Sequence, residues 1–216
     1  KKRGLDADFV YGLGIVALVF GFIGAKLLYC IVEMDAFLNE PMRILSGSGF
    51  VLYGGVIAGI FAAMVYSKHK RIAFFQYFDL AVPSLAIAQG FGRIGCFLAG
   101  CCYGRETDSA IGIVFHNSSI APNGVKLIPT QLFSSAGDFL IAIVLLLYAR
   151  KDRKTGRIGA LYLILYSAGR FIMEFFRNDY RGSIGILSTS QFISLIVLVT
   201  GIIMIFMKEL PSANKE

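Results

Sequence analysis

Long apolar stretches alternate with short polar connections along the whole chain. Most of them come close to the roughly 20 residues that a membrane-spanning helix needs. They cover residues 8–32, 47–66, 74–100, 131–149, 158–176 and 191–206. This pattern predicts an all-α integral membrane protein of about six transmembrane helices.

Composition supports a membrane protein and argues against an ordinary soluble domain. Of the 216 residues, 56% are hydrophobic and 16% are charged, whereas about a quarter of the residues of a soluble domain are charged. The net charge of +7 does not indicate nucleic acid as a partner, because the basic residues gather in the connections between apolar stretches.

The distribution of Lys and Arg predicts the orientation of the chain. Basic residues concentrate in alternate connections, most densely between Arg150 and Arg157, which places both termini in the cytoplasm. We expect a single transmembrane domain over residues 1–216, with an outward-facing loop at 101–130. Residues 111–115 of that loop suit a short strand or a membrane-surface segment. The start at Lys1 without a Met predicts that an N-terminal helix is missing from this chain.

Charged residues inside the apolar stretches point to a functional site. A charge at mid-bilayer costs about 2.5–3.5 kcal/mol, and the predicted topology puts four such residues in the outer half of the membrane: Lys26, Arg93, Arg170 and Glu174. The predicted level also holds Tyr53, Gly54, Gly55 and Cys96. Two guanidinium groups against one carboxylate favour an anionic ligand, and phosphate is the obvious candidate.

Helical spacing groups part of this set. Tyr166, Arg170, Glu174 and Arg177 follow one another at intervals of four, four and three residues, so they share a helix face. Arg170 can pair with Glu174, and a purely structural ion pair is an open alternative for Glu174. Two further acids fall toward the inner half, where we expect structural pairing or partial solvation: Asp79 and Asp138.

All four cysteines fall on the outward side: Cys30, Cys96, Cys101 and Cys102. A disulfide to the loop pair, apolar packing, and a reactive thiol whose pKa is lowered by Arg93 are all open interpretations. No metal site is expected, because no His lies near in sequence and the spacing matches no standard zinc pattern.

These segments resemble motifs of the prolipoprotein diacylglyceryl transferases, a family of bacterial inner-membrane enzymes. The principal motif is Gly92-Arg-Ile-Gly-Cys-Phe-Leu-Ala-Gly-Cys-Cys-Tyr-Gly104. Further matches are Gly24-Ala-Lys26, Tyr53-Gly-Gly-Val-Ile-Ala-Gly59, Pro129-Thr-Gln-Leu132, the 166–177 group and Gln191. The resemblance covers nearly the whole chain.

The resemblance implies a transferase of lipoprotein biosynthesis. Such an enzyme moves the diacylglyceryl group of phosphatidylglycerol, or of another anionic phospholipid, to a cysteine thiol of a lipobox-containing precursor protein and releases glycerol phosphate. The protein is then a multi-pass protein of the bacterial plasma membrane, surrounded by membrane lipids, with its active site toward the outer leaflet. No cofactor is implied.

The resemblance also implies roles for individual residues. Arg93 and Arg170 hold the phosphate, Glu174 positions Arg170, and Tyr166 binds the headgroup. The other expected substrate-binding residues are Gly54, Gly55, Arg177, Gly104 and Lys26.

Three positions of the expected catalytic set differ from the family pattern. Tyr53 stands where the family has His, Cys96 where it has Asn, and Cys101 where it has an acidic residue. A phenol, with a pKa near 10, is a poor general base at neutral pH. Two alternatives therefore stay open: a relative that uses its own cysteines to modify a different lipid or acceptor, and a non-catalytic phospholipid-binding membrane protein.

Overall fold

The structure is a computed structural model that describes residues 7–47, 49–178 and 183–207. The chain is mostly helical, as predicted, and divides into two compact units, Lys1–Tyr77 with Pro211–Glu216, and Phe78–Leu210. Each unit is described by itself, and a single transmembrane domain over 1–216 stays a prediction. Both termini, predicted to be cytoplasmic, lie outside the described residues.

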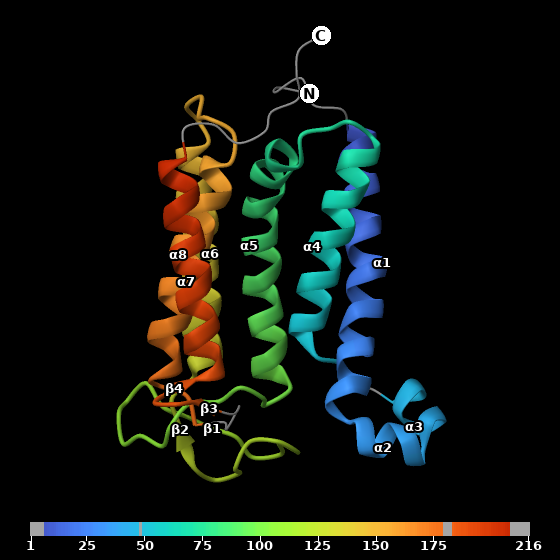
Figure 1. The fold of residues 1–216 in the computed structure, drawn as a ribbon. Helices are drawn as coiled ribbons and strands as arrows, with labels where there is room; N and C mark the ends of the chain where they lie inside the picture. Colours follow the sequence, from blue (N-terminus) through green and yellow to red (C-terminus); the bar gives the residue numbers. More distant parts are fainter. Residues whose placement is uncertain (1–6, 48, 179–182, 208–216) are drawn as a thin grey trace. The chain divides into compact units, whose positions relative to one another are not determined.

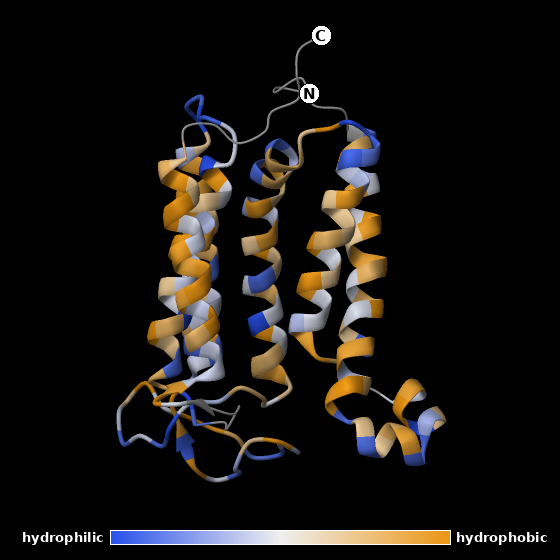
Figure 2. Cartoon of the chain, in the orientation of Figure 1, coloured by the Kyte–Doolittle hydropathy of each residue, from blue (hydrophilic) through white to orange (hydrophobic). Residues whose placement is uncertain are grey.

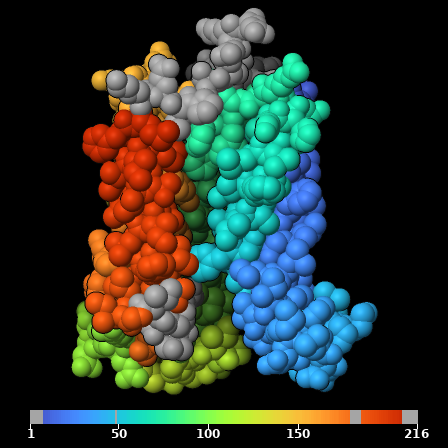
Figure 3. Space-filling view, viewed as in Figure 1, coloured from blue at the N-terminus to red at the C-terminus, as the bar shows by residue number. Residues whose placement is uncertain are grey.

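The first unit is formed by the N-terminal helices. It contains α1 (Ala7–Val32), α2 (Met34–Asn39), α3 (Pro41–Ser46), α4 (Leu52–His69) and the beginning of α5 (Phe74–Leu98). The two short helices α2 and α3 form a lobe at the C-terminal end of α1 (Figures 1 and 3).

Small residues bring α1 and α4 into close contact. A Cβ added to Gly55 would lie 2.8 Å from the carbonyl oxygen of Gly21, and one added to Gly24 would lie 2.5 Å from that of Gly54. Glycine at these positions lets the two backbones approach closely, as the motifs of small residues in membrane helices predict.

The second unit contains α5 from Phe78 on, α6 (Thr130–Tyr148), α7 (Arg157–Glu174) and α8 (Thr189–Phe206). Its core is formed by the buried side chains of Val82, Ala86, Ala142, Leu145, Ile158 and Tyr162. Asp79 has the structural role expected from its position, because its carboxylate accepts hydrogen bonds from the backbone N–H groups of Gly156 and Gly159, at 2.6 and 2.7 Å. These bonds satisfy orphan donors at the start of α7.

Two small hairpins lie at the same end of the second unit (Figure 1). The strands β1 (Ile113–Val114) and β2 (Lys126–Leu127) pair antiparallel, and so do β3 (Ser183–Ile184) and β4 (Leu187–Ser188). The predicted 101–130 loop therefore has a strand within residues 111–115.

Four described helices are long and apolar enough to cross a membrane: Asp8–Val32, Phe74–Leu98, Thr130–Tyr148 and Thr189–Phe206. Figure 2 shows hydrophobic residues along the long helices and hydrophilic ones mainly at their ends and in the connections. The other two long helices are more polar. The helix α7 contains Arg157, Arg170 and Glu174, and α4 ends in Lys68 and His69.

Candidate active site

A cavity of about 180 Å³ in the second unit brings charged side chains of three helices together. Arg93 comes from α5, Asp138 from α6, and Tyr166 and Arg170 from α7. Apolar and small residues complete the lining: Phe133, Ser134, Gly137, Ile141, Gly169, Ile172 and Met173. The cavity thus contains both arginines for which the sequence suggested a phosphate ligand.

Two polar partners among the described residues hold Arg170 in place. Its Nη2 atom donates a hydrogen bond to Ser190 Oγ at 2.6 Å and lies 2.7 Å from Glu174 Oε2 in an ion pair. The side chains of Arg170 and Glu174 are only 12% and 9% exposed. A pair in such surroundings is screened much less than a surface pair, so Glu174 fixes the guanidinium at the cavity wall.

Tyr166 lies in a stack of aromatic rings. Its ring is 5.7 Å from that of Tyr162, with an angle of 18° between the planes, and Tyr162 donates a hydrogen bond to Gln89 Oε1 at 2.8 Å. The stack orients Tyr166 along the wall that also presents Arg170. A phenol in this position can donate a hydrogen bond to an anionic headgroup.

Asp138 is the member of the cavity that sequence reasoning missed. It is buried, with 5% of its surface exposed, and its Oδ2 atom makes no hydrogen bond within the described residues. The sequence analysis grouped it with Asp79 as a structural residue of the inner half. However, it lies two turns into α6, about 12 Å along the helix, and this depth could have placed it at the level of Arg93.

Asp138 changes the charge balance expected for the site. Together with Glu174 it gives two carboxylates against two guanidinium groups, where the sequence suggested a surplus of positive charge. The surplus arises when Asp138 is protonated. The expected surplus is therefore absent while Asp138 is ionised, and uptake of a proton by this one carboxyl group raises the affinity of the cavity for an anion.

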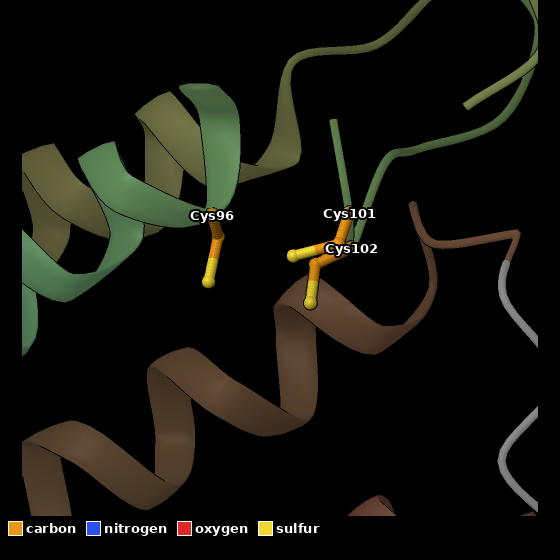
Figure 4. Close-up of side chains that lie close together, drawn as sticks. All are labelled: Cys96, Cys101 and Cys102. Atoms are coloured by element: carbon orange, nitrogen blue, oxygen red, sulfur yellow. The ribbon is translucent and has the colours of Figure 1, made fainter. Parts of the chain in front are cut away.

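A second group of side chains gathers where α5 ends. Cys96 lies in the last turn of α5, Cys101 and Cys102 lie in the loop that follows, and the three sulfur atoms are within 4.8 Å of one another (Figure 4). All three are partly buried cysteines outside any disulfide, and Cys30 of the first unit is a buried cysteine that is also outside any disulfide. The sequence left open a disulfide from Cys30 or Cys96 to the loop pair, and the structure contains neither.

The loop that carries the cysteines is fixed by the start of α6. Thr130 Oγ1 donates a hydrogen bond to the carbonyl oxygen of Cys102 at 2.8 Å, and Gln131 Nε2 donates one to that of Cys101 at 2.7 Å. Thr130 and Gln131 are each 1% exposed. The loop needs such support, because Cys102 has a positive φ of 63°, which is costly for a residue other than glycine.

The pKa of the Cys101 thiol is raised to about 12, by burial first and then by the neighbouring thiols of Cys102 and Cys96. Burial disfavours the charged form, and ionisation of one thiol disfavours ionisation of the next. Cys101 by itself is therefore protonated at neutral pH and a weak nucleophile, which argues against its use as a free covalent relay.

Gly104 and Arg177 join two loops next to the cysteines. They form an isolated antiparallel bridge, and the backbone N–H of Gly104 also donates to the carbonyl oxygen of Ile128 at 3.0 Å. A Cβ on Gly104 would lie 2.6 Å from that oxygen and 2.8 Å from the carbonyl oxygen of Phe176. Glycine is required here by close packing, and Arg177 is buried beside it.

The remaining predicted site residues belong to the first unit. Lys26 Nζ donates hydrogen bonds to the carbonyl oxygens of Gly47 and Gly49, at 2.7 and 3.2 Å, and lies 4.9 Å from the centre of the Phe50 ring. It thereby fixes the connection that leads into α4. Tyr53 is exposed in the first turn of α4.

Gly54 and Gly55 lie in the packing interface of α1 and α4 described above. The structure therefore gives them a packing role within their unit. It gathers Arg93, Tyr166, Arg170 and Asp138 at one cavity, and Cys96, Cys101 and Cys102 at one loop, all within the second unit.

Comparison with known proteins identifies the family. The family model for prolipoprotein diacylglyceryl transferase matches residues 1–207. The phosphatidylglycerol–prolipoprotein diacylglyceryl transferase of Clostridium tetani is 49% identical over 203 residues, which are 94% of this chain and 82% of that protein. The phosphatidylglycerol–prolipoprotein diacylglyceryl transferase 2 of Clostridium perfringens is 47% identical over 205 residues, which are 94% of this chain and 80% of that protein.

A third relative, from Clostridioides difficile, carries the same name and is 35% identical over 205 residues, which cover 94% of this chain and 79% of that protein. The match extends over both compact units and includes the segments that carry the cavity and the cysteine loop. The chain belongs to the prolipoprotein diacylglyceryl transferase family, as its sequence motifs predicted.

Proposed function

We propose that this chain transfers the diacylglyceryl group of phosphatidylglycerol to the thiol of a cysteine in a lipobox-containing precursor protein and releases glycerol phosphate. The names of its relatives give the donor lipid and the class of acceptor. The observation that carries the proposal to this chain's own residues is the cavity lined by both Arg93 and Arg170.

The two arginines act on the phosphate. Guanidinium groups present several donors in a fixed plane and stay charged in apolar surroundings, so they bind a phosphodiester and stabilise the second negative charge that develops as glycerol phosphate leaves. Glu174 and Ser190 keep Arg170 oriented, which spares reorganisation during the reaction. Tyr166 donates a hydrogen bond to the headgroup.

Asp138 takes the proton of the acceptor. The S–H bond of the acceptor breaks, the proton passes to Asp138, and the sulfur electron pair attacks the glyceryl carbon bonded to the phosphate. The carbon–oxygen bond breaks and its electron pair leaves with the phosphate. Protonation of Asp138 removes a negative charge beside the arginines while the leaving group gains one, so the two steps support each other electrostatically.

Six helices span the membrane in this proposal: α1, α4, α5, α6, α7 and α8. Tyr166 and Arg170 of α7 line the cavity and Glu174 pairs with Arg170, which offsets the cost of placing these residues in the bilayer. The basic connection 150–157 and both termini lie in the cytoplasm of a bacterium, and the 101–130 loop lies at the outer leaflet of the inner membrane. Gly104 and Arg177 position the loop, and within the first unit Lys26 fixes the connection that leads into α4.

A defined transfer reaction tests the proposal. The full-length protein is reconstituted with phosphatidylglycerol and a lipobox peptide, and mass spectrometry follows the peptide. We expect a thioether-linked diacylglyceryl adduct on the cysteine and release of glycerol phosphate.

The controls separate chemistry from binding. A peptide with Ser in place of the cysteine and vesicles of phosphatidylethanolamine should give no adduct. Absence of the adduct with phosphatidylglycerol, in a preparation where a relative from the family is active, would overturn the proposal.

A further inference from the structure

The proposed transfer reaction assigns no role to the cysteine cluster at the end of α5. Three sulfur atoms from two adjacent segments lie within 4.8 Å of one another, although no charge or hydrogen bond of the family reaction requires thiols there. Figure 4 shows the three side chains close together at the end of α5, where their sulfur atoms can reach a common ligand.

We propose that Cys96, Cys101 and Cys102 form a binding site for a thiophilic divalent cation, of which Zn²⁺ is the representative. Zinc–sulfur bonds of about 2.3 Å in a tetrahedral site separate the sulfur atoms by roughly 3.8 Å. The sulfur atoms all lie within 4.8 Å of one another, so side-chain rotations that bring them closer by about 1 Å or less reach that separation.

The charge of the cluster agrees with a cation. Three neighbouring thiols cannot all ionise without a counter-charge, because each thiolate opposes the next. A divalent cation supplies the counter-charge: the three S–H protons are released to solvent, the thiolates bind the ion, and the site has a net charge of −1.

The scaffold around the cluster is already fixed. Thr130 and Gln131, both almost fully buried, hold the carbonyl groups of Cys102 and Cys101 from the first turn of α6. Cys101 is tied to α5 by its backbone N–H, which donates to the carbonyl oxygen of Cys96 at 3.1 Å. Binding of a cation would therefore require little ordering of the chain.

Three protein ligands leave the fourth position of a tetrahedral ion open, as in catalytic zinc sites. This part of the inference rests on the proposed function, in which the acceptor is a thiol. The acceptor sulfur fills the open position, and the cation lowers its pKa. The proton of the acceptor thiol is then released to solvent on binding, and the bonds formed and broken at the glyceryl carbon are those of the proposed reaction.

Metal content and a cobalt spectrum test the site directly. The full-length protein, purified from cells grown with zinc, is analysed for metal and then exchanged with Co²⁺. We expect close to one ion per chain and a sulfur-to-cobalt charge-transfer band. Both should fall at least tenfold in Cys101→Ser and in Cys96→Ser, and both should persist in Cys30→Ser, which removes the one cysteine outside the cluster. Thermal unfolding of each variant confirms that it is folded.

A peptide experiment tests the open position. The lipobox peptide should shift the cobalt band, and the same peptide with Ser in place of the cysteine should not. Wild-type protein that binds no more metal than folded Cys101→Ser, or intact-mass data that show a disulfide within the cluster, would overturn the site.

The two proposals fail in different ways. If transfer activity is unchanged after the metal has been removed, the proposed role of the cation in the reaction is wrong and the transferase proposal stands. Tight metal binding without any transfer to the peptide would support the site and overturn the transferase.

Discussion

At the scale of single residues, Asp138 is the side chain with the largest effect on the expected chemistry. It lies in the cavity with Arg93 and Arg170, and its buried Oδ2 atom makes no hydrogen bond within the described residues. A buried carboxylate oxygen without a hydrogen-bond partner lowers the stability of the fold, and a function of the group explains why such a cost is kept. Acceptance of a proton during the reaction is such a function.

Replacement of this carboxylate tests its role. Asp138→Asn keeps the shape of the side chain but cannot take up a proton, so we expect kcat for peptide modification to fall about 10²- to 10⁴-fold. The KM for phosphatidylglycerol should not rise, because the amide removes a negative charge beside the two arginines. Asp138→Glu should recover part of the rate. Activity of the Asn variant within about threefold of the wild type would contradict the assignment.

The raised pKa of Cys101 predicts slow alkylation of the metal-free protein. At pH 8 a thiol with a pKa of about 12 contains about 10³-fold less thiolate than a thiol with a pKa of about 9. The thiolate of higher pKa is the better nucleophile, which offsets part of this difference. The alkylation rate of Cys101 should therefore be about 50-fold lower. The rate should rise about tenfold for each pH unit up to the pKa.

Site-resolved mass spectrometry with iodoacetamide measures this rate. Ser119→Cys places a reference thiol at an exposed position of the same loop. Equal rates for Cys101 and the reference thiol at pH 8 would show that the environment of Cys101 is not as described.

Part of the site could be predicted from single residues and part could not. The spacing of Arg170 and Glu174 on one helix predicts their ion pair, which the structure contains. Asp138 was missed because depth in the membrane was estimated from the ends of each apolar stretch, and this says little about which helix face meets a neighbour. The convergence of Cys96 with Cys101 and Cys102 depends on a positive φ at Gly100 and Cys102, which sequence spacing does not reveal.

At the scale of elements, the contact of α1 with α4 depends on glycine at particular positions of the helix. A Cβ on Gly24 would lie 2.5 Å from the carbonyl oxygen of Gly54, whereas one on Gly14 of the same helix would meet nothing within 4 Å. Gly24→Ala should therefore destabilise the protein by about 1–3 kcal/mol through overpacking. Gly14→Ala should be neutral or stabilising by up to about 1 kcal/mol, because alanine loses less entropy in a helix.

Thermal unfolding in detergent compares these two variants. The glycine contacts predict a lower Tm for Gly24→Ala than for Gly14→Ala. The same Tm for both would mean that the two backbones are not in close contact.

Helix boundaries show what the hydrophobic pattern captures. The ends of α1 and α6 agree with the predicted stretches within one residue or two. In contrast, α4 starts at Leu52 and not near Gly47. The intervening residues are apolar enough to extend the stretch, but Lys26 binds their carbonyl oxygens and holds them outside the helix. Apolar residues indicate which part of the chain can lie in the membrane, whereas the backbone hydrogen bonds determine where the helix begins.

At the scale of the whole molecule, composition predicted a membrane protein, and four described helices meet the requirements for crossing. The charged residues of α7 lower its hydropathy, and one of them, Arg170, lines the cavity. In the proposed six-helix topology, a hydropathy criterion alone would miss such a helix, because the residues of a site make it more polar.

Labelling of intact cells tests the orientation. A membrane-impermeant maleimide should label Ser119→Cys in the outward loop more than the parent protein. It should label Asp152→Cys only after permeabilisation, because the basic connection around it is proposed to be cytoplasmic. The opposite pattern would invert the topology and place the cavity toward the other leaflet.

The most direct test of the account is the transfer rate after removal of each cavity arginine. With phosphatidylglycerol and a lipobox peptide, Arg93→Gln and Arg170→Gln should each lower kcat/KM by about 10²- to 10³-fold, because each removes charge that stabilises the leaving phosphate. The kcat/KM of Arg150→Gln, a change in the exposed connection after α6, should stay within about twofold of the wild-type value. If the two cavity variants instead transfer the diacylglyceryl group as fast as Arg150→Gln, the cavity is not the active site.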